Sequence, residues 1–428
     1  MQFSSTTNSN LLWSVVERVF PKVSSAVMLV MLAKVSAPAV VGNYAWSMIL
    51  LLLVQSVTDT AVKQVAVMVI NTVQGESFLR NYVKLTPWFA STFMALSLYV
   101  SSLFNSVLAG GILLLMPVAL IPLVSARRVK SVALLQRSGH WKQLAKGQLL
   151  AFLISVGISL PVLLATRSLL GPVTQLLVTE ICMTIFSNYF SKQATVDMRE
   201  TSRDNLALTE YLHVAGSSLV SWMQSQSDRM LIAVFAGTSN LGLYSFSWAI
   251  SRTAGDTLSN AVINVLRPLI GWVGESSPRE IAKKVDPLLL RALLMSFSVI
   301  TATWIGIHFF LRAFLGLQWN AALGAASIMA VAIIPSLLAW ALETLLISQR
   351  KAKFLTPVKI LGTFGSISIA YVANISLNLA GLCVVFRELI ELCFVMILNR
   401  NYLPKKSLTW GIVATFLLTT IGWALAIG

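Results

Sequence analysis

Four charged residues lie inside two neighbouring apolar segments of the sequence. Asp228 and Arg229 lie in the first segment, and Arg252 and Asp256 lie in the second. An ionisable side chain near the centre of a bilayer costs about 2.5–3.5 kcal/mol on insertion scales, so it normally faces protein or water and marks a functional site. Basic side chains in such a place suit anions, and arginine pairs well with phosphate.

The two segments predict a helical hairpin in a membrane. A turn of sequence GTSNL spans residues 237–241, and the second helix is expected to begin at Gly242. Asp228 and Arg252 lie at similar distances from the turn, so they should lie at similar depth. They either form a buried ion pair that locks the two helices, or Arg252 faces a central pathway while Asp228 or Asp256 holds its orientation.

Helical periodicity gathers polar side chains on one face of each helix of the hairpin, because residues i and i+4 lie on the same face. The first helix carries Ser217, Ser221, Gln224 and Asp228 on one face and Trp222, Ser225 and Arg229 on the adjoining one. The second helix carries Ser245, Trp248, Arg252, Asp256 and Ser259 on one face. The serine, glutamine and tryptophan side chains suit sugar hydroxyls and ring faces, although tryptophan is also common at membrane interfaces.

A second group of cations lies in the first apolar segment. The spacing i, i+4, i+8 and i+11 places four polar side chains on one helical face: Ser14, Arg18, Lys22 and Ser25. Pro21 should bend the helix between the two cations. The cations either snorkel to the cytoplasmic interface, with Glu17 as a partner, or face a cavity. A cavity is favoured because Lys22 lies too deep for easy snorkelling.

Other charged residues of the apolar segments have structural interpretations. Asp59 and Lys63 are four residues apart and can neutralise each other, as can Arg387 and Glu391. A structural role is also predicted for Glu180, Glu343 and Glu388. A membrane carboxylate such as Glu180 could alternatively bind a coupling proton.

The composition is that of a polytopic membrane protein. Of 428 residues, 56% are hydrophobic and only 11% are charged, whereas soluble domains carry about 25% charged residues. Apolar segments near 20 residues long predict thirteen membrane helices. They span residues 12–35, 38–62, 82–105, 107–126, 144–166, 168–190, 208–236, 241–265, 287–311, 322–347, 355–374, 378–398 and 407–427.

The net charge of +16 arises mainly from connections between these segments. Most lysines and arginines fall in alternate connections, which is the pattern of cytoplasmic loops. This distribution places the N-terminus in the cytoplasm and, with thirteen helices, the C-terminus on the far side. It also excludes nucleic-acid binding as the reason for the charge.

An internal repeat is predicted at an offset of 200 residues. The pattern Ala33, Gly42, Tyr44, Ser47 matches Ala233, Gly242, Tyr244, Ser247. Weaker matches in the same order extend it to two parallel six-helix lobes, related by an axis along the membrane normal. The predicted divisions are an N-terminal lobe at 1–190, a cytoplasmic linker at 191–206, a C-terminal lobe at 207–398 and an extra helix at 399–428.

The cysteines and histidines do not predict a disulfide, metal site or cofactor. Cys182, Cys383 and Cys393 lie in apolar segments without a CxxC pattern, so they are expected to be small core residues. The three histidines do not form a ligand set.

The hairpin resembles the polysaccharide flippase branch of the multidrug/oligosaccharidyl-lipid/polysaccharide exporter superfamily. The residues that carry the resemblance are Asp228, Gly237, Gly242, Tyr244, Ser245, Arg252 and the pair Arg267-Pro268 that ends the second helix. The resemblance implies an inner-membrane flippase that moves undecaprenyl-diphosphate-linked oligosaccharide to the periplasmic leaflet for O-antigen, capsule or exopolysaccharide assembly. It further implies alternating access, a monomer and no covalent chemistry, with a downstream polysaccharide polymerase as a possible partner.

On this interpretation, cations flank a cleft that holds the diphosphate head while the lipid tail stays in the bilayer. The predicted substrate-binding residues are Arg18, Lys22, Gln224, Asp228, Arg229, Trp248, Arg252 and Asp256. Many relatives have twelve or fourteen helices, so the count of thirteen departs from the family's pattern.

Two alternatives remain open from the sequence. A cation-coupled multidrug exporter of the same superfamily would have an acidic cleft, whereas the candidate lining here is mixed to basic. A membrane polysaccharide polymerase or ligase would present a sizeable periplasmic loop, whereas the far-side connections here are short.

Overall fold

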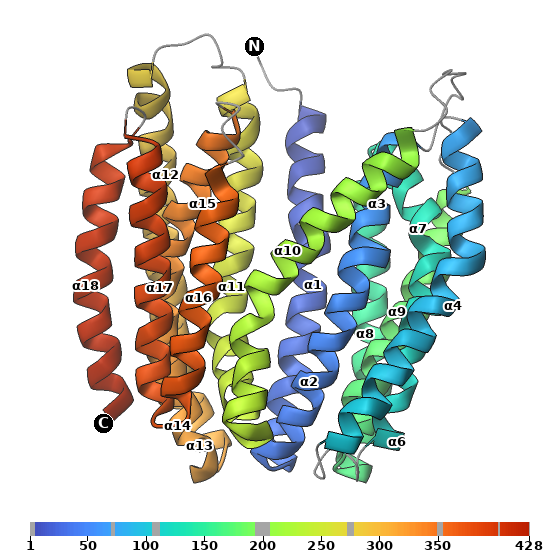
Figure 1. The fold of residues 1–428 in the computed structure, drawn as a ribbon, viewed down its shortest axis with the longest axis horizontal. Coiled ribbons are helices and arrows are strands. Elements are labelled where there is room, and N and C mark those ends of the chain that lie inside the picture. Colours follow the sequence, from blue (N-terminus) through green and yellow to red (C-terminus); the bar gives the residue numbers. More distant parts are fainter. Residues whose placement is uncertain are drawn as a thin grey trace. The chain divides into compact units, whose positions relative to one another are not determined.

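A computed structural model describes residues 5–69, 73–104, 112–192, 206–271, 278–348, 354–400 and 403–427. Within these ranges all regular secondary structure is helical, and thirteen long helical segments follow one another along the chain. Figure 1 labels these helices along the chain. The predicted all-α fold is confirmed, and over the described residues each of the thirteen predicted segments overlaps one helical segment along most of its length.

The first seven helical segments reach as far as Phe235. They consist of α1 (Ser5–Val35), α2 (Pro38–Gln55) with α3 (Ala61–Val69), α4 (Val73–Phe104), α6 (Ile112–Leu115) with α7 (Ile121–Arg137), α8 (Trp141–Thr166), α9 (Leu170–Ser191) and α10 (Leu206–Phe235). A π-helical turn, Ser56–Thr60, joins α2 to α3, and a 3-10 turn, Met116–Leu120, joins α6 to α7. Prolines at 117 and 122 explain the second interruption, because proline lacks the N–H that continues an α-helix.

The remaining helices begin at Gly237. They are α11 (Gly237–Gly271), α12 (Pro278–Ile305) with α13 (Arg312–Phe314), α14 (Asn320–Met329) with α15 (Ile333–Ser348), α16 (Leu355–Ala373), α17 (Leu377–Leu398) and α18 (Lys405–Ile427). The 3-10 turn Ala330–Ala332 between α14 and α15 precedes Pro335, which again removes a helical donor. A π-helical turn, Gly306–Leu311, joins α12 to α13.

The chain is a multi-pass membrane protein. Among the described residues, seven helical stretches are long and apolar enough by composition to cross a bilayer. They are Pro38–Lys63, Trp141–Thr166, Leu170–Ser191, Val285–Phe314, Leu317–Ile347, Leu355–Ala373 and Lys405–Ile427. Helices α10, α11 and α17 are not among them, because charged and polar residues interrupt their apolar sequence.

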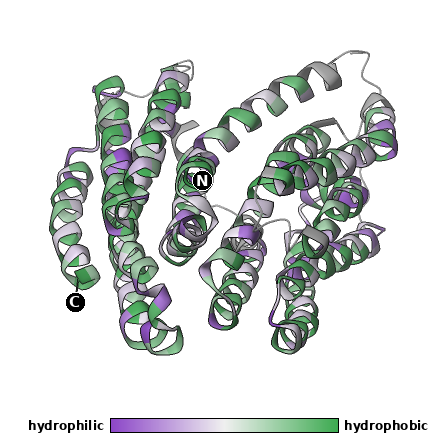
Figure 2. Ribbon diagram, turned by 60° about the horizontal axis from the view of Figure 1, so that its bottom comes forward, coloured by the Kyte–Doolittle hydropathy of each residue, from purple (hydrophilic) through white to green (hydrophobic). Residues whose placement is uncertain are grey.

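Many large apolar side chains are exposed, and Figure 2 shows how hydrophobic and hydrophilic residues are distributed along the helices. Large side chains such as Phe89, Leu103 and Phe364 are 74%, 66% and 64% exposed. So much exposed apolar area is expected where lipid is the solvent, and polar groups turn inward instead. Cys393 is among the exposed side chains of α17, and Cys182 and Cys383 are half-buried. The expectation that the cysteines are core residues is therefore wrong.

The chain divides into two compact units. The first comprises Met1–Ser36 with Asn43–Gln226, and the second comprises Ala37–Gly42 with Ser227–Gly428. Helix α18 packs on α12, α14 and α15 within the second unit. The lobe boundaries predicted from the sequence stay a prediction, and most of the predicted linker lies outside the described residues.

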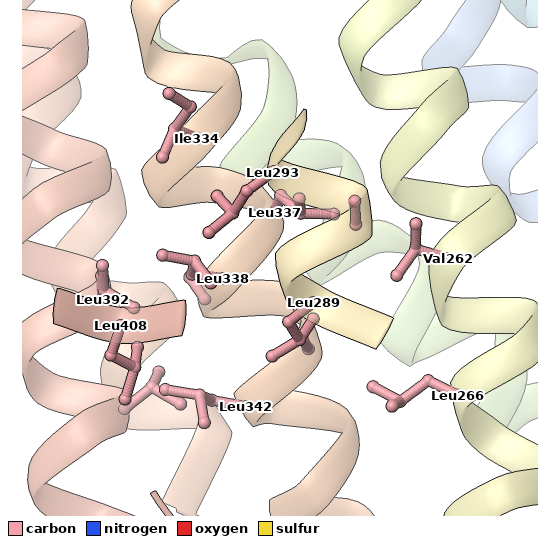
Figure 3. Packing of buried hydrophobic residues seen from close by; sticks show 14 of the residues in the cluster. Val262, Leu266, Leu289, Leu293, Ile334, Leu337, Leu338, Leu342, Leu392 and Leu408 are labelled. Atoms are coloured by element: carbon pink, nitrogen blue, oxygen red, sulfur yellow. The ribbon is translucent and has the colours of Figure 1, made fainter. Parts of the chain in front are cut away.

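Helix α15 is the centre of the second unit. The span Leu317–Ile347 ends in α15, and 94% of its most apolar 18-residue stretch is buried. Leu337, Leu338 and Leu342 pack against leucines of α11, α12, α17 and α18 (Figure 3). Dispersion contacts among these side chains hold the unit together, because the hydrophobic effect is weak between helices already in lipid.

The helical hairpin turns more sharply than the sequence predicts. Helix α10 ends at Phe235 and α11 begins at Gly237, so the predicted turn residues 237–241 form the first turn of a helix instead. Gly237 makes this possible with a φ of 81°, in the left-handed region that glycine enters without penalty. Asn240 then donates to the carbonyl of Ala236, which helps to close the hairpin.

Two glycines related by the predicted repeat meet at a close helix crossing within the second unit. A Cβ atom on Gly42 would overlap the carbonyl oxygen of Thr238, and one on Gly242 would overlap the carbonyl oxygen of Pro38. The contact is symmetric, since each glycine faces the residue four positions before the other. The 200-residue offset is therefore visible in the packing.

This crossing predicts that Gly242→Val lowers the yield of folded protein several-fold. Overpacking costs about 1–3 kcal/mol, and here the neighbour is a rigid backbone atom. The measurement is the monodisperse fraction after detergent extraction. Gly157→Ala in α8 is the control, since nothing lies within 4 Å of a Cβ built there. An equal yield for Gly242→Val would show that the helices are further apart.

Candidate functional site

Three arginines surround one tryptophan in the second unit. The guanidinium carbons of Arg229, Arg252 and Arg387 lie 5.2, 5.3 and 5.8 Å from the centre of the Trp248 ring. Cation–π attraction is effective within about 6 Å. We name this group, with its carboxylate partners, the Trp248 cluster.

Three helices position the Trp248 cluster. Arg229 lies near the end of α10, Trp248 and Arg252 lie one turn apart on α11, and Arg387 lies in α17. The face of α11 predicted from i, i+4 spacing is thus the face that gathers the charged groups. Tyr244, one turn before Trp248, extends it, with its ring 6.2 Å from the Trp248 ring.

Arg252 is the most deeply buried cation of the cluster, at 2% exposed. Its Nη2 donates to Ser336 Oγ at 2.9 Å and lies 3.2 Å from Asp256 Oδ1 and 3.9 Å from Glu388 Oε1. Its Nε and Nη1 atoms have no hydrogen-bond partner among the described residues. Buried donors of this kind are rare in folded proteins and point to a ligand or water at the site.

Arg387 shares Glu388 with Arg252 and also contacts a third carboxylate, Asp228. Its Nη2 pairs with Glu388 at 2.9 Å, and its Nη1 lies 3.6 Å from Asp228. Tyr244 also donates its hydroxyl to Asp228, at 2.6 Å. The expected pairs Asp228–Arg252 and Arg387–Glu391 are therefore replaced by contacts of Asp228 with Arg387 and Tyr244, and of Arg387 with Glu388.

The charges of the Trp248 cluster balance. The cluster contains three guanidinium groups and three carboxylates, and ion pairs join Asp228, Asp256 and Glu388 to Arg252 and Arg387. The site holds several arginines, as predicted, but it is not cationic overall. The carboxylates fix the positions of the Arg252 and Arg387 guanidinium groups before any ligand arrives.

The structure brings together five of the eight predicted site residues: Asp228, Arg229, Trp248, Arg252 and Asp256. Gln224 and Lys22 belong to the first unit. The side chain of Arg18 lies outside the described part of the structure. Arg387 and Glu388 were predicted to have a structural role, and Ser336 was not predicted at all, because all three come from sequence segments far from the hairpin.

Other ionisable groups form separate pairs. In the first unit, Lys63 bonds Asp59 at 2.6 Å, as predicted, and Arg128 bonds Glu180 at 3.0 Å. In the second unit, Lys359 contacts Glu343 and bonds Glu391 at 2.7 Å. Glu180 thus has an arginine partner that its sequence neighbourhood did not reveal.

The fold is similar to those of solved membrane transporters. An inward-facing multidrug resistance MATE family transporter of the MOP superfamily matches with a TM-score of 0.64 and 10% identity over 95% of this chain and 99% of that one. The lipid II flippase MurJ matches with a TM-score of 0.57 and 11% identity over 99% and 97%. A MOP superfamily transporter from Pyrococcus furiosus matches with a TM-score of 0.59 and 12% identity over 91% and 93%.

Comparison with curated proteins gave no match. A family model described as polysaccharide biosynthesis protein matches residues 85–324, which is more than half of the chain. The predicted resemblance to the superfamily is confirmed by this match together with the fold. The chain belongs to the polysaccharide biosynthesis protein family.

Proposed function

We propose that this protein is a flippase that moves an undecaprenyl-diphosphate-linked oligosaccharide from the cytoplasmic to the periplasmic leaflet by alternating access. The observation that carries the proposal is the Trp248 cluster, in which two donor atoms of the buried Arg252 have no hydrogen-bond partner in the described part of the chain. Family membership supports a polysaccharide precursor as the substrate. The basic connections support an orientation in the bacterial inner membrane with the N-terminus on the cytoplasmic side.

The chemistry of the cluster suits a diphosphate. Guanidinium groups bind phosphate oxygens with charge-assisted hydrogen bonds, which are about twice as strong as neutral ones. Arg229 and Arg387 are partly exposed, so they can meet the ligand first. Because three carboxylates compete for the same donors, the diphosphate would bind weakly enough to be released.

The proposal needs no covalent step. The lipid tail would stay in the bilayer while the sugar head crosses, and a polysaccharide polymerase would consume the product in the periplasm. A monomer is sufficient, since the Trp248 cluster is built within one chain.

The experiment compares strains that differ in this gene. The deletion strain should accumulate the lipid-linked oligosaccharide in the cytoplasmic leaflet, and the wild-type gene should restore its appearance in the periplasmic leaflet. Lys22→Ala and Arg18→Ala, added back separately at matched expression, test whether the first helix also binds the substrate.

Two results would overturn the proposal. Normal translocation with failed polymerisation would favour a polymerase or ligase. Unchanged lipid-linked sugars together with reduced dye efflux would favour a multidrug exporter.

A further inference from the structure

The first unit contains a pocket that the Trp248 cluster does not use. Its volume is about 500 Å³, within the range of about 300–1,000 Å³ that is usual for small-molecule sites. One wall is the end of α2 with the π-helical turn Ser56–Thr60, and the other is α10. All of its lining residues belong to the first unit.

The lining is rich in uncharged hydrogen-bonding groups. Helix α10 contributes four serines, Ser217, Ser218, Ser221 and Ser225, and the opposite wall contributes Gln55 and Ser56. Among the described residues that line the pocket, Asp59 is the one with an ionisable side chain. Hydroxyl and amide groups without a basic side chain suit a neutral ligand with many hydroxyls, and they do not suit a diphosphate.

Asp59 offers an acceptor to such a ligand. The residue is 7% exposed, and Lys63 bonds its Oδ2 atom at 2.6 Å. Its Oδ1 atom is buried without a hydrogen-bond partner in the described structure. Lys63 and Arg128, 3.9 Å away, offset its charge, which weakens any attraction for a free cation.

Two hydrogen bonds from α10 hold the walls of the pocket together. Trp222 donates its indole N–H to the carbonyl of Ile49 at 3.2 Å. About three helical turns earlier, Tyr211 donates its hydroxyl to the carbonyl of Val57 at 3.4 Å. The second bond uses a carbonyl of the π-helical turn, a feature that is frequent at functional sites.

Trp222 also lines the pocket. An aromatic ring beside hydroxyl-rich walls gives a sugar both an apolar face to lie on and polar groups around its edge. Because its N–H is bonded to the backbone, the ring is held in one orientation. This arrangement is that of a preorganised site.

We infer that this pocket binds a neutral sugar ring of the lipid-linked oligosaccharide. The inference rests on the proposed function for the source of the sugar. The pocket is a site for sugar that is separate from the Trp248 cluster, because all of its lining residues belong to the first unit.

The test measures binding of three probes to the purified full-length protein in lipid nanodiscs. The probes are undecaprenyl diphosphate, the undecaprenyl-diphosphate-linked oligosaccharide extracted from the source organism, and the lipophilic cation tetraphenylphosphonium. The variant Ser221→Leu fills the pocket from an exposed position on α10. Gln55→Leu fills it from the other wall, and Ser298→Leu on the exposed face of α12 is the matched control.

We expect Ser221→Leu and Gln55→Leu to weaken binding of the sugar-bearing lipid at least tenfold, which corresponds to about 1.4 kcal/mol. Binding of undecaprenyl diphosphate should stay within twofold of the wild type. The control should bind both lipids normally.

Two outcomes contradict the inference. If both lipids weaken equally, or neither does, the pocket holds no sugar. If tetraphenylphosphonium binding is lost while the sugar-bearing lipid still binds, the pocket is a cation site. Arg252→Gln separates this inference from the proposed function. If the Arg252→Gln variant binds both lipids normally, the proposed diphosphate site is wrong. The sugar pocket is still decided by Ser221→Leu, from its affinity for the sugar-bearing lipid relative to undecaprenyl diphosphate.

Discussion

Arg252→Gln is expected to lower the rate of lipid-linked oligosaccharide translocation about ten- to hundred-fold. Hydrogen bonds to charged groups contribute about 1.5–3 kcal/mol, and glutamine lacks both the charge and the forked donors of arginine. On the proposed function, the diphosphate would bind the Nε and Nη1 donors of Arg252, which no described residue accepts from.

The measurement is the periplasmic appearance of labelled lipid-linked oligosaccharide in the complemented deletion strain, with membrane expression matched by immunoblot. Arg291→Gln is the control, because Arg291 is an exposed arginine of α12 outside the Trp248 cluster. Wild-type rates for Arg252→Gln at matched expression would mean that Arg252 only holds helices together. An equal loss for Arg291→Gln would mean that the assay reports net charge.

Arg252→Lys separates charge from geometry at the same position. A lysine retains the positive charge but presents a point charge in place of a planar fork. We expect a partial recovery relative to Arg252→Gln if the diphosphate needs mainly charge. No recovery would indicate that the bidentate geometry is required.

Glu388→Gln is expected to destabilise the second unit by about 3–5 kcal/mol, the usual cost of removing one partner of a buried ion pair. Glu388 is 5% exposed and serves two arginines, since its Oε1 atom lies 2.9 Å from Arg387 and 3.9 Å from Arg252. Without its charge, two positive groups remain in a low-dielectric interior with less compensation.

The free energy of unfolding is measured by denaturant titration of purified protein in mixed micelles. Asp256→Asn is the matched control: it removes a carboxylate that also pairs with Arg252, but whose side chain is 25% exposed. Solvent screening should limit its effect to about 1 kcal/mol or less. Equal effects for the two variants would contradict the central role given to Glu388.

Glu388→Gln also tests why the Trp248 cluster is electrically balanced. If Glu388 holds the arginines in place, Glu388→Gln should lower stability and diphosphate binding together. If it only neutralises them, its removal should raise diphosphate affinity while stability falls.

Composition and periodicity alone determined much of this protein. Apolar length predicted the thirteen helices, because every backbone group must be bonded within the bilayer. The i, i+4 spacing on α11 predicted that Trp248, Arg252 and Asp256 share a face, since helix geometry is local. The match of Gly42 with Gly242 predicted a repeat, and the two glycines prove to meet at a close crossing.

Tertiary structure decided which charges pair. Asp228 contacts Arg387, which lies in a helix more than 150 residues later in the sequence. Arg252 donates to Ser336 and lies near Glu388. Spacing along one helix cannot reveal these partners, because they depend on which faces of distant helices pack together. The same holds for the serine-lined pocket, which exists because Tyr211 and Trp222 bond carbonyls of a distant helix and its π-helical turn.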